Sequence, residues 1–232
     1  MSEKLKVAVV GAGRMGSFVA GQLPDDVEKI IIDTNEVTAK AVAEACGGTY
    51  FTEMSGVKDA DVVAIVLPAG VIPKVIDALG SSAKEGAVIM NMATSGQIED
   101  EVKAKYTHAT FVNAKIIGHA DSMKEGAPCY VVVGTEDQAV YEKVARVLPG
   151  YTKVVMGDSE IVPKINTIGS HVGIRAAIEV RKELQAYNIP KDWEDVLIYT
   201  VCAGTMRAYV DNNLGHFGAV LAEKLEKEML GK

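Results

Sequence analysis

Apolar residues follow two alternating patterns along the first two thirds of the chain. Short continuous apolar runs predict strands that are buried on both faces, and amphipathic stretches between them predict helices. Strands are expected at 6–10, 29–32, 62–67, 87–91, 110–113, 130–133 and 153–155, and helices at 15–23, 36–46, 71–79, 98–105 and 138–148. This alternation is typical of a doubly wound, mostly parallel α/β sheet, with the last two strands at one edge.

The pattern changes near residue 157, after which no further strand is predicted. Apolar residues recur three and four positions apart from Ile161 to Tyr187, which predicts one long amphipathic helix that ends before Pro190. Two further helices are expected near 193–210 and 218–230.

We therefore predict two domains, an α/β domain over residues 1–158 and a small all-helical domain over residues 159–232. A helical segment of this size is small for an independent hydrophobic core. We expect it to complete its core against a second copy of the chain, in a homodimer.

Composition and charge narrow the class of protein. Hydrophobic residues make up 48% of the chain and the net charge is −7 without a basic cluster, which argues against a nucleic-acid partner. No apolar run reaches the roughly 18 residues of a membrane helix, and no signal peptide is recognisable, so we expect a cytoplasmic protein without a membrane partner. The cysteines and histidines lack metal-ligand spacing, which predicts no protein-bound metal.

A glycine-rich segment, Gly11-Ala12-Gly13-Arg14-Met15-Gly16, follows the first predicted strand and opens a helix. Gly11 permits a tight turn, Gly13 lets a diphosphate approach the backbone, and Gly16 allows the helix to pack closely on the strand. The N–H groups of the helix start, around Arg14 and Met15, would face the diphosphate. The sequence therefore predicts a dinucleotide-binding domain of the Rossmann type.

Asp33 ends the second predicted strand, where its carboxylate can accept hydrogen bonds from ribose hydroxyls and would repel the 2′-phosphate of NADP. We therefore predict NAD as the cofactor, with NADP as the alternative. A competing interpretation is that Asp33 only caps the next helix. Further cofactor contacts are expected at strand ends, at Leu67, Pro68, Asn91 and Thr94, although ordinary turns would explain these residues as well.

Several later segments are similar to blocks of a known family. These are residues 88–94, 111–119, 125–134, 163–166 and 203–207. Their order and spacing resemble the β-hydroxyacid dehydrogenases, relatives of 6-phosphogluconate dehydrogenase. The resemblance implies hydride transfer between a nicotinamide cofactor and a small hydroxy acid.

The resemblance also implies site residues in the second half. Lys164 falls where the family has its catalytic lysine, whose burial would let it exchange a proton near neutral pH. Asn166 corresponds to the family's asparagine, although on a regular helix it would point about 200° away from Lys164. Lys115, Gly118 and His119 fall in its substrate loop, where Lys115 would pair with a carboxylate or phosphate of the substrate.

The long predicted helix offers a second set of candidates. Lys164, Thr167, His171 and Arg175 share one polar face, and His171 could supply a proton near neutral pH. The competing interpretation is an ordinary solvated face.

These observations favour an NAD(P)-dependent oxidoreductase that acts on a small hydroxy acid. Three alternatives remain open: an imine (pyrroline-carboxylate-like) or deazaflavin-linked NADP reductase, a non-catalytic dinucleotide sensor, and a dimerisation module that binds no dinucleotide. Activity on imines, binding without turnover, or no binding at all would distinguish them.

Overall fold

The computed structural model of the chain describes residues 4–149 and 152–231. The chain divides into two compact units, residues 1–167 and 168–232. The predicted boundary at residues 158–159 marks the change from strands to helices. The boundary between the two compact units lies further along, inside the long helix.

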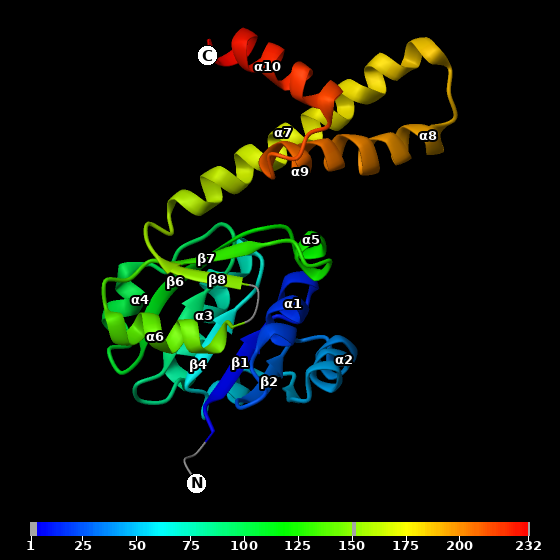
Figure 1. Cartoon of the computed structure of the whole chain (residues 1–232). Helices are drawn as coiled ribbons and strands as arrows, with labels where there is room; N and C mark the ends of the chain where they lie inside the picture. Colours follow the sequence, from blue (N-terminus) through cyan, green and yellow to red (C-terminus); the bar gives the residue numbers. More distant parts are fainter. Residues whose placement is uncertain (1–3, 150–151, 232) are drawn as a thin grey trace. The chain divides into compact units, whose positions relative to one another are not determined.

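The described residues of the first unit form an eight-stranded sheet in the order β3-β2-β1-β4-β5-β6-β7-β8 (Figure 1). The strands are β1 (Lys6–Val10), β2 (Glu28–Ile32), β3 (Thr49–Phe51), β4 (Val62–Ile65), β5 (Val88–Asn91), β6 (Thr110–Ile117), β7 (Cys129–Val133) and β8 (Thr152–Met156). All neighbouring pairs are parallel except β6 and β7, which run antiparallel. The doubly wound, mostly parallel sheet predicted from the sequence is confirmed.

Helices cover both faces of this sheet. They are α1 (Arg14–Gln22), α2 (Glu36–Cys46), α3 (Ile72–Ser82), α4 (Asp100–Lys105), α5 (Ala120–Lys124) and α6 (Gln138–Val147). The apolar sides of α1, α2 and α6 pack on one face of the sheet, and that of α3 packs on the other. Successive residues of a strand point to opposite faces, so Val7 and Val9 join one core layer while Ala8 and Val10 join the other.

The predicted elements differ from the structure at several of their ends and, most clearly, at β3, α5 and β6. The edge strand β3 was not predicted, because its three residues are all exposed and give no buried run. The short helix α5 was not predicted either. Strand β6 was expected to end at Asn113, but it continues to Ile117, so that Lys115 lies within a strand rather than in a loop.

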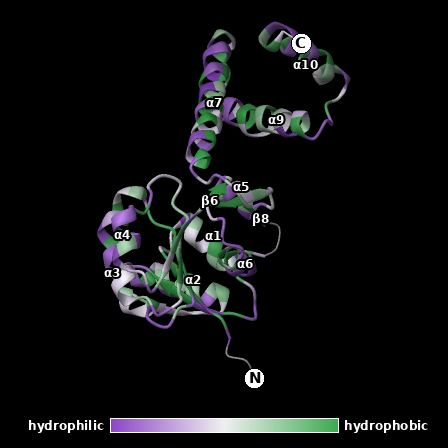
Figure 2. Cartoon of the chain, turned by 90° about the vertical axis from the view of Figure 1, so that its left-hand side faces the viewer, coloured by the Kyte–Doolittle hydropathy of each residue, from purple (hydrophilic) through white to green (hydrophobic). Residues whose placement is uncertain are grey.

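The second unit is helical, as predicted. Helix α7 (Ile161–Leu184) begins in the first unit and is followed by α8 (Lys191–Val196), a π-helical turn (Leu197–Cys202), α9 (Ala203–Val210) and α10 (His216–Leu230). Among its described residues, 168–231, none is buried, and many hydrophobic side chains are exposed. Figure 2 shows hydrophobic and hydrophilic residues interspersed along its helices. No helix of the described chain has the length and apolar character needed to cross a membrane.

Candidate functional site

The glycine-rich turn links β1 to α1 at the carboxyl end of the sheet. Gly11 has a φ of +103°, and a Cβ there would lie 2.5 Å from the carbonyl oxygen of Val66. A Cβ at Gly16 would lie 1.8 Å from the carbonyl oxygen of Gly11, whereas one at Gly13 would meet nothing within 4 Å. The turn is therefore tight at Gly11, closely packed at Gly16 and open at Gly13, which leaves its backbone accessible to a diphosphate.

Asp33 joins this turn to the end of β2. Its Oδ2 accepts a hydrogen bond of 2.7 Å from the amide of Ala12, and its Oδ1 accepts one of 2.9 Å from the amide of Asn35. The side chain that caps α2 is that of Asn35, which accepts from the amide of Thr38 at 3.2 Å. The interpretation of Asp33 as the helix cap is therefore wrong, and each of its oxygens keeps a lone pair for a ribose hydroxyl.

The other residues of the turn offer backbone groups more than side chains. Arg14 is exposed and forms an ion pair of 3.4 Å with Asp121 of α5. Met15 is half-buried and packs against the core between α1 and the sheet. Their predicted part in cofactor binding therefore rests on their amides at the start of α1.

The loops after β4 and β5 lie beside the turn. Leu67 abuts it, since its Cδ2 lies 2.9 Å from the position of a Cβ at Gly11, and Pro68 is exposed at the start of the short helical segment Ala69–Val71. Gly96 lies against that segment, because a Cβ on Gly96 would be 3.2 Å from the Cβ of Ala69. The two loops therefore form a continuous edge, on which Thr94 is exposed.

Asn91 was predicted to contact the cofactor, but its side chain is fully buried. Its Nδ2 donates to the carbonyl of Gly96 at 3.0 Å and to Oδ1 of Asn113 at 3.1 Å, and its Oδ1 accepts from the amide of Ala93. Both donor positions of this amide and one lone pair of its oxygen are thus used within the protein. Asn91 fixes the loop 92–96 rather than reaching a ligand, which corrects the prediction.

A cavity of about 230 Å³ continues this edge beyond β5. It lies between the loop after β5, the carboxyl-terminal half of β6 and the start of α7, all within the first unit. Its lining residues are Ser95, Gly96, Gln97, Asn113, Lys115, Ser159, Glu160, Pro163 and Lys164.

Lys115 lies at the buried end of this cavity and is only 2% exposed. Its Nζ donates to the carbonyl oxygens of Ala93 at 2.5 Å and Gly96 at 2.8 Å. Burial lowers the pKa of Lys115 to about 8. The expected loop position of Lys115 is wrong, because β6 continues through this residue and buries it. Its contact with a substrate stays a prediction.

Lys164 also lines the cavity, but its side chain is exposed, so the burial expected for a catalytic lysine is missing. Asn166 is not part of the lining. Its Nδ2 instead donates to the carbonyl oxygen of Ile116 at 2.8 Å and ties the start of α7 to β6. Its predicted role in substrate binding is therefore replaced by a structural one, and its separation from Lys164 agrees with the helical spacing.

Gly118 and His119 lie beyond the cavity and do not line it. A Cβ at Gly118 would lie 2.6 Å from the Sδ of Met123, and His119 is exposed at the start of α5. His171 belongs to the second unit and is exposed. Close packing against α5 explains Gly118, and nothing in the structure places His119 or His171 at the cavity.

Sequence reasoning missed five polar residues of the cavity: Ser95, Gln97, Asn113, Ser159 and Glu160. Ser159 is buried, and its Oγ lies 2.4 Å from the position of a Cβ at Gly134. A signal was present for three of them, because Asn113 ends the strand predicted at 110–113, and Ser159 and Glu160 immediately precede the long helix. Such positions gather at the carboxyl edge of a parallel sheet.

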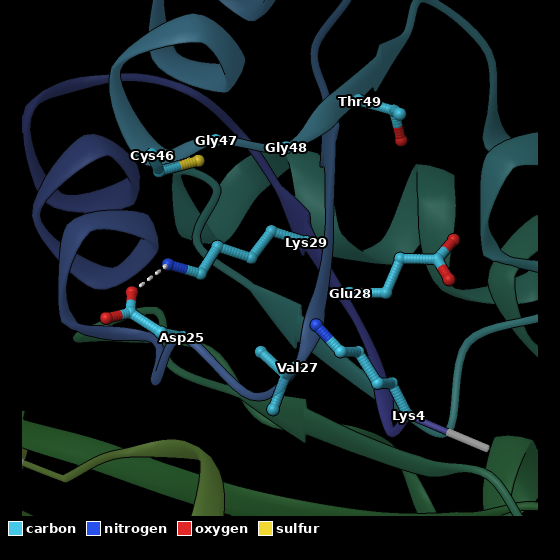
Figure 3. A pocket seen from close by; sticks show the side chains of 9 residues that line it. All are labelled: Lys4, Asp25, Val27, Glu28, Lys29, Cys46, Gly47, Gly48 and Thr49. Carbon is cyan, nitrogen blue, oxygen red and sulfur yellow. Dashed lines mark ion pairs between the residues drawn. The ribbon is translucent and has the colours of Figure 1, made fainter. Parts of the chain in front are cut away.

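A larger pocket of about 500 Å³ lies at the opposite, amino-terminal end of β1, β2 and β3 (Figure 3). Lys29 is buried there and forms an ion pair of 3.7 Å with Asp25. Burial raises the pKa of the neighbouring Cys46 thiol, against the opposing effect of Lys29. This pocket is separated by the length of the strands from the glycine-rich turn and does not extend the turn's edge.

Residues 6–162 match the family described as the NAD binding domain of 6-phosphogluconate dehydrogenase.

Solved structures of low sequence identity share the fold. Mycobacterium tuberculosis 3-hydroxyisobutyrate dehydrogenase is 20% identical, with a TM-score of 0.62 over 84% of this chain and 70% of that one. A pyrroline-5-carboxylate reductase from Coxiella burnetii is 15% identical, with a TM-score of 0.71 over 96% and 85%. An imine reductase variant from Myxococcus stipitatus is 19% identical, with a TM-score of 0.59 over 90% and 75%.

Proposed function

The chain belongs to the family of the NAD binding domain of 6-phosphogluconate dehydrogenase, a family of NAD(P)-dependent dehydrogenases and reductases, and we propose that it oxidises and reduces a small hydroxy acid with NAD(H). The observation that carries this proposal is the continuous edge from Asp33 through the glycine-rich turn and the loops after β4 and β5 to the cavity. From β2 to β6 in the sheet, this edge would hold the cofactor first and the substrate last.

The first part of the edge suits an extended dinucleotide. With one ribose on Asp33 and the diphosphate at Gly13, the other half of the cofactor has to continue past β1 toward β4 and β5. Asp33 favours NAD over NADP, because its carboxylate would repel a 2′-phosphate. Bound NAD supplies the hydride acceptor or donor.

The cavity suits a small anionic substrate. Its volume of about 230 Å³ leaves room for few heavy atoms, and two amino groups, those of Lys115 and Lys164, line it against one carboxylate, that of Glu160. Lys164 lies at the exposed side, where its ammonium can hold a substrate carboxylate.

The residues of the cavity have to move one proton. When a hydroxy acid is oxidised, its carbon loses a hydride to the cofactor, the C=O bond forms, and the hydroxyl proton passes to a group of the protein. Reduction requires the same group to return the proton to the oxygen. The sequence resemblance assigns this group to Lys164, the exposed lysine of the pair.

A substitution at Gly13 tests the cofactor site. A valine there has room in the folded protein, since a Cβ meets nothing within 4 Å, but it would cover the amides that face the diphosphate. We expect Gly13→Val to melt within a few degrees of the wild type and to weaken NADH binding, measured by fluorescence titration, by roughly 100-fold or about 2.7 kcal/mol.

Gly21→Val is the matched control, because Gly21 lies in the same helix, also in open space, away from the turn. It should leave the dissociation constant for NADH unchanged. Equal binding of NADH by the wild type and Gly13→Val would contradict the proposed cofactor site.

A screen of small 3-hydroxy acids and cyclic imines, followed by NADH absorbance, tests the reaction. We expect turnover of at least one hydroxy acid. Turnover of imines alone would replace this proposal with a reductase, as the names of two of the similar structures suggest. Binding of NADH without any turnover would make the protein a dinucleotide sensor.

The helical unit supports a homodimer as the working form. Among its described residues, 168–231, none is buried, although α7, α9 and α10 carry many apolar side chains. A monomer with this surface would leave a large apolar area in water. A second copy is the partner that we propose, because most soluble oligomers are symmetric assemblies of one chain.

A further inference from the structure

Among the described residues of the first unit, Lys115 is the charged residue with the lowest exposure, 2%, and it lies in the middle of β6. Burial of an ammonium group is costly unless a charge compensates for it. Among the described residues, no aspartate or glutamate forms an ion pair with it, and its contacts are the carbonyls of Ala93 and Gly96. A methionine would fill the same space without this cost, so fold stability does not explain a lysine here.

The geometry of its amine leaves one position for a ligand. The Nζ atom has four tetrahedral positions, of which the side chain takes one and the two carbonyls take two more. The fourth carries a proton in the ammonium form and a lone pair in the neutral form. Because Lys115 lines the cavity, this fourth position is the one that a small molecule bound there would contact.

The two carbonyls are themselves held in place. The oxygen of Gly96 accepts from both Lys115 and Asn91, and the amide of Ala93 donates to Asn91. Gly96 also lies against Ala69, on the edge that leads to the glycine-rich turn. The amine is therefore fixed at the point where the cofactor edge meets the cavity.

The charged groups that face Lys115 in the cavity are Glu160 and Lys164, which have opposite charges and are both exposed. The loop after β5 contributes only the uncharged Ser95, Gly96 and Gln97, and the β7 partner of Lys115 is Val132. Burial thus dominates and lowers the pKa of Lys115 to about 8, so that both forms of the amine are populated near neutral pH.

We propose that Lys115, and not Lys164, exchanges the proton with the hydroxyl oxygen of the substrate. This inference rests on the proposed function. In oxidation, the neutral amine takes the hydroxyl proton while the carbon loses its hydride to NAD and the C=O bond forms. In reduction, the ammonium returns that proton to the oxygen. Lys164 holds the substrate carboxylate at the exposed side of the cavity.

The test compares three lysine-to-methionine variants on the hydroxy acid with the highest wild-type turnover in the screen. Lys115→Met should bind NADH as the wild type does but lower kcat by roughly 100-fold or more, the usual contribution of a general acid or base. Lys164→Met should mainly raise KM. Lys143→Met is the matched control, because Lys143, although only half-buried, also has a lowered pKa and donates to a carbonyl, that of Gly86, outside the cavity.

The pH profile separates proton transfer from a structural role. Wild-type kcat/KM for oxidation should rise through a pKa near 8, and that for reduction should fall through it, since oxidation needs the neutral amine and reduction the ammonium. Lys164→Met and Lys143→Met should keep both limbs, and Lys115→Met should lose them. Lys115→Arg, which keeps the charge but cannot release a proton, should also be inactive.

Loss of the limbs in Lys164→Met with their retention in Lys115→Met would overturn the inference while leaving the proposed function intact. A flat wild-type profile between about pH 6.5 and 9.5 would also overturn it, whether or not the variants fold. Wild-type protein that turns over no hydroxy acid would contradict the proposed function, and this inference with it.

Discussion

At the scale of single residues, the carboxylate of Asp33 links the shape of the cofactor site to its proposed preference for NAD over NADP. One oxygen holds the amide of Ala12 in the glycine-rich turn, and the other holds the amide of Asn35 at the start of α2. The charge that would exclude a 2′-phosphate is therefore fixed beside the turn by two backbone contacts.

Replacement of Asp33 by asparagine should change cofactor preference without breaking the turn. The amide oxygen still accepts a hydrogen bond, but the repulsion of a 2′-phosphate is gone. We expect Asp33→Asn to shift the ratio of NADH to NADPH affinity by roughly tenfold toward NADPH, or about 1.4 kcal/mol. Fluorescence titration with both cofactors measures this ratio.

Glu36→Gln is the control for this change, because Glu36 carries the same charge in the exposed first turn of α2. It should leave the ratio unchanged. A wild type that binds NADPH more tightly than NADH would show that Asp33 does not set the preference.

The two lysines of the cavity show where residue-level reasoning from the sequence ends. The family resemblance placed Lys164 and Lys115 in one functional region, and both line the cavity. The sequence predicted a buried Lys164 and an accessible Lys115, and the structure shows the reverse. The burial of Lys115 depends on strand β6 and on the loop after β5 that covers it, which are separate segments of the sequence. The apolar residues around Lys115, from Phe111 to Ile117, were the available sign that the strand continues.

At the scale of elements, the sequence predicted the strands of the sheet interior well. Strand β1 was predicted to the residue, since it contains the continuous apolar run of residues 7–10 and a glycine-rich turn follows it. Strand β3 was missed, because an exposed edge strand of three residues needs only its partner β2 and no buried run. Strand order and the antiparallel pairing of β6 with β7 also arise from contacts that no local pattern contains.

Asp61 joins several elements at the end of the sheet opposite the cofactor edge. It precedes β4, accepts from the amide of Lys6 in β1 at 2.7 Å, and forms an ion pair of 2.5 Å with Lys84 after α3. Burial alone would raise the pKa of Asp61, but the hydrogen bonds from Lys6 and Lys84 and the charges of Lys84 and Lys143 lower it.

Because the pKa of Asp61 is lowered in the folded state, Asp61 stabilises the fold at pH values where its carboxylate is charged in both the folded and the unfolded chain. This contribution is complete above the unfolded pKa of roughly 4 and is lost as the pH falls through the lower folded value. We expect Asp61→Asn to reduce the free energy of unfolding at pH 7 by roughly 1–2 kcal/mol, and the difference from the wild type to shrink below about pH 4. Urea denaturation at a series of pH values measures it.

Asp100→Asn serves as the control, because Asp100 forms its ion pair with Lys103 on the exposed surface of one helix. Its effect should be small at every pH. A difference between Asp61→Asn and the wild type that grows on acidification would contradict this account.

At the scale of the whole molecule, the two units differ in how they bury apolar surface. The first unit has two core layers on either side of its sheet. In the second unit, none of the described residues is buried, and α7 alone exposes Ile168, Val172, Ile174 and Ile178 by more than half. Because folding of so small a helical unit needs additional buried surface, we expect stability and assembly of the chain to be coupled.

A charge introduced into the exposed apolar surface of α7 tests this coupling. The wild type should have twice the chain mass of 24.6 kDa by light scattering, and its melting temperature should rise with protein concentration. Ile178→Asp should dissociate the dimer and remove that concentration dependence, because a carboxylate would have to be desolvated in the interface. Val37→Asp is the matched control, since Val37 is 79% exposed on α2 and should leave the mass unchanged. A wild-type mass equal to one chain at every concentration would contradict the homodimer and would require the helical unit to be stable with its apolar residues in water.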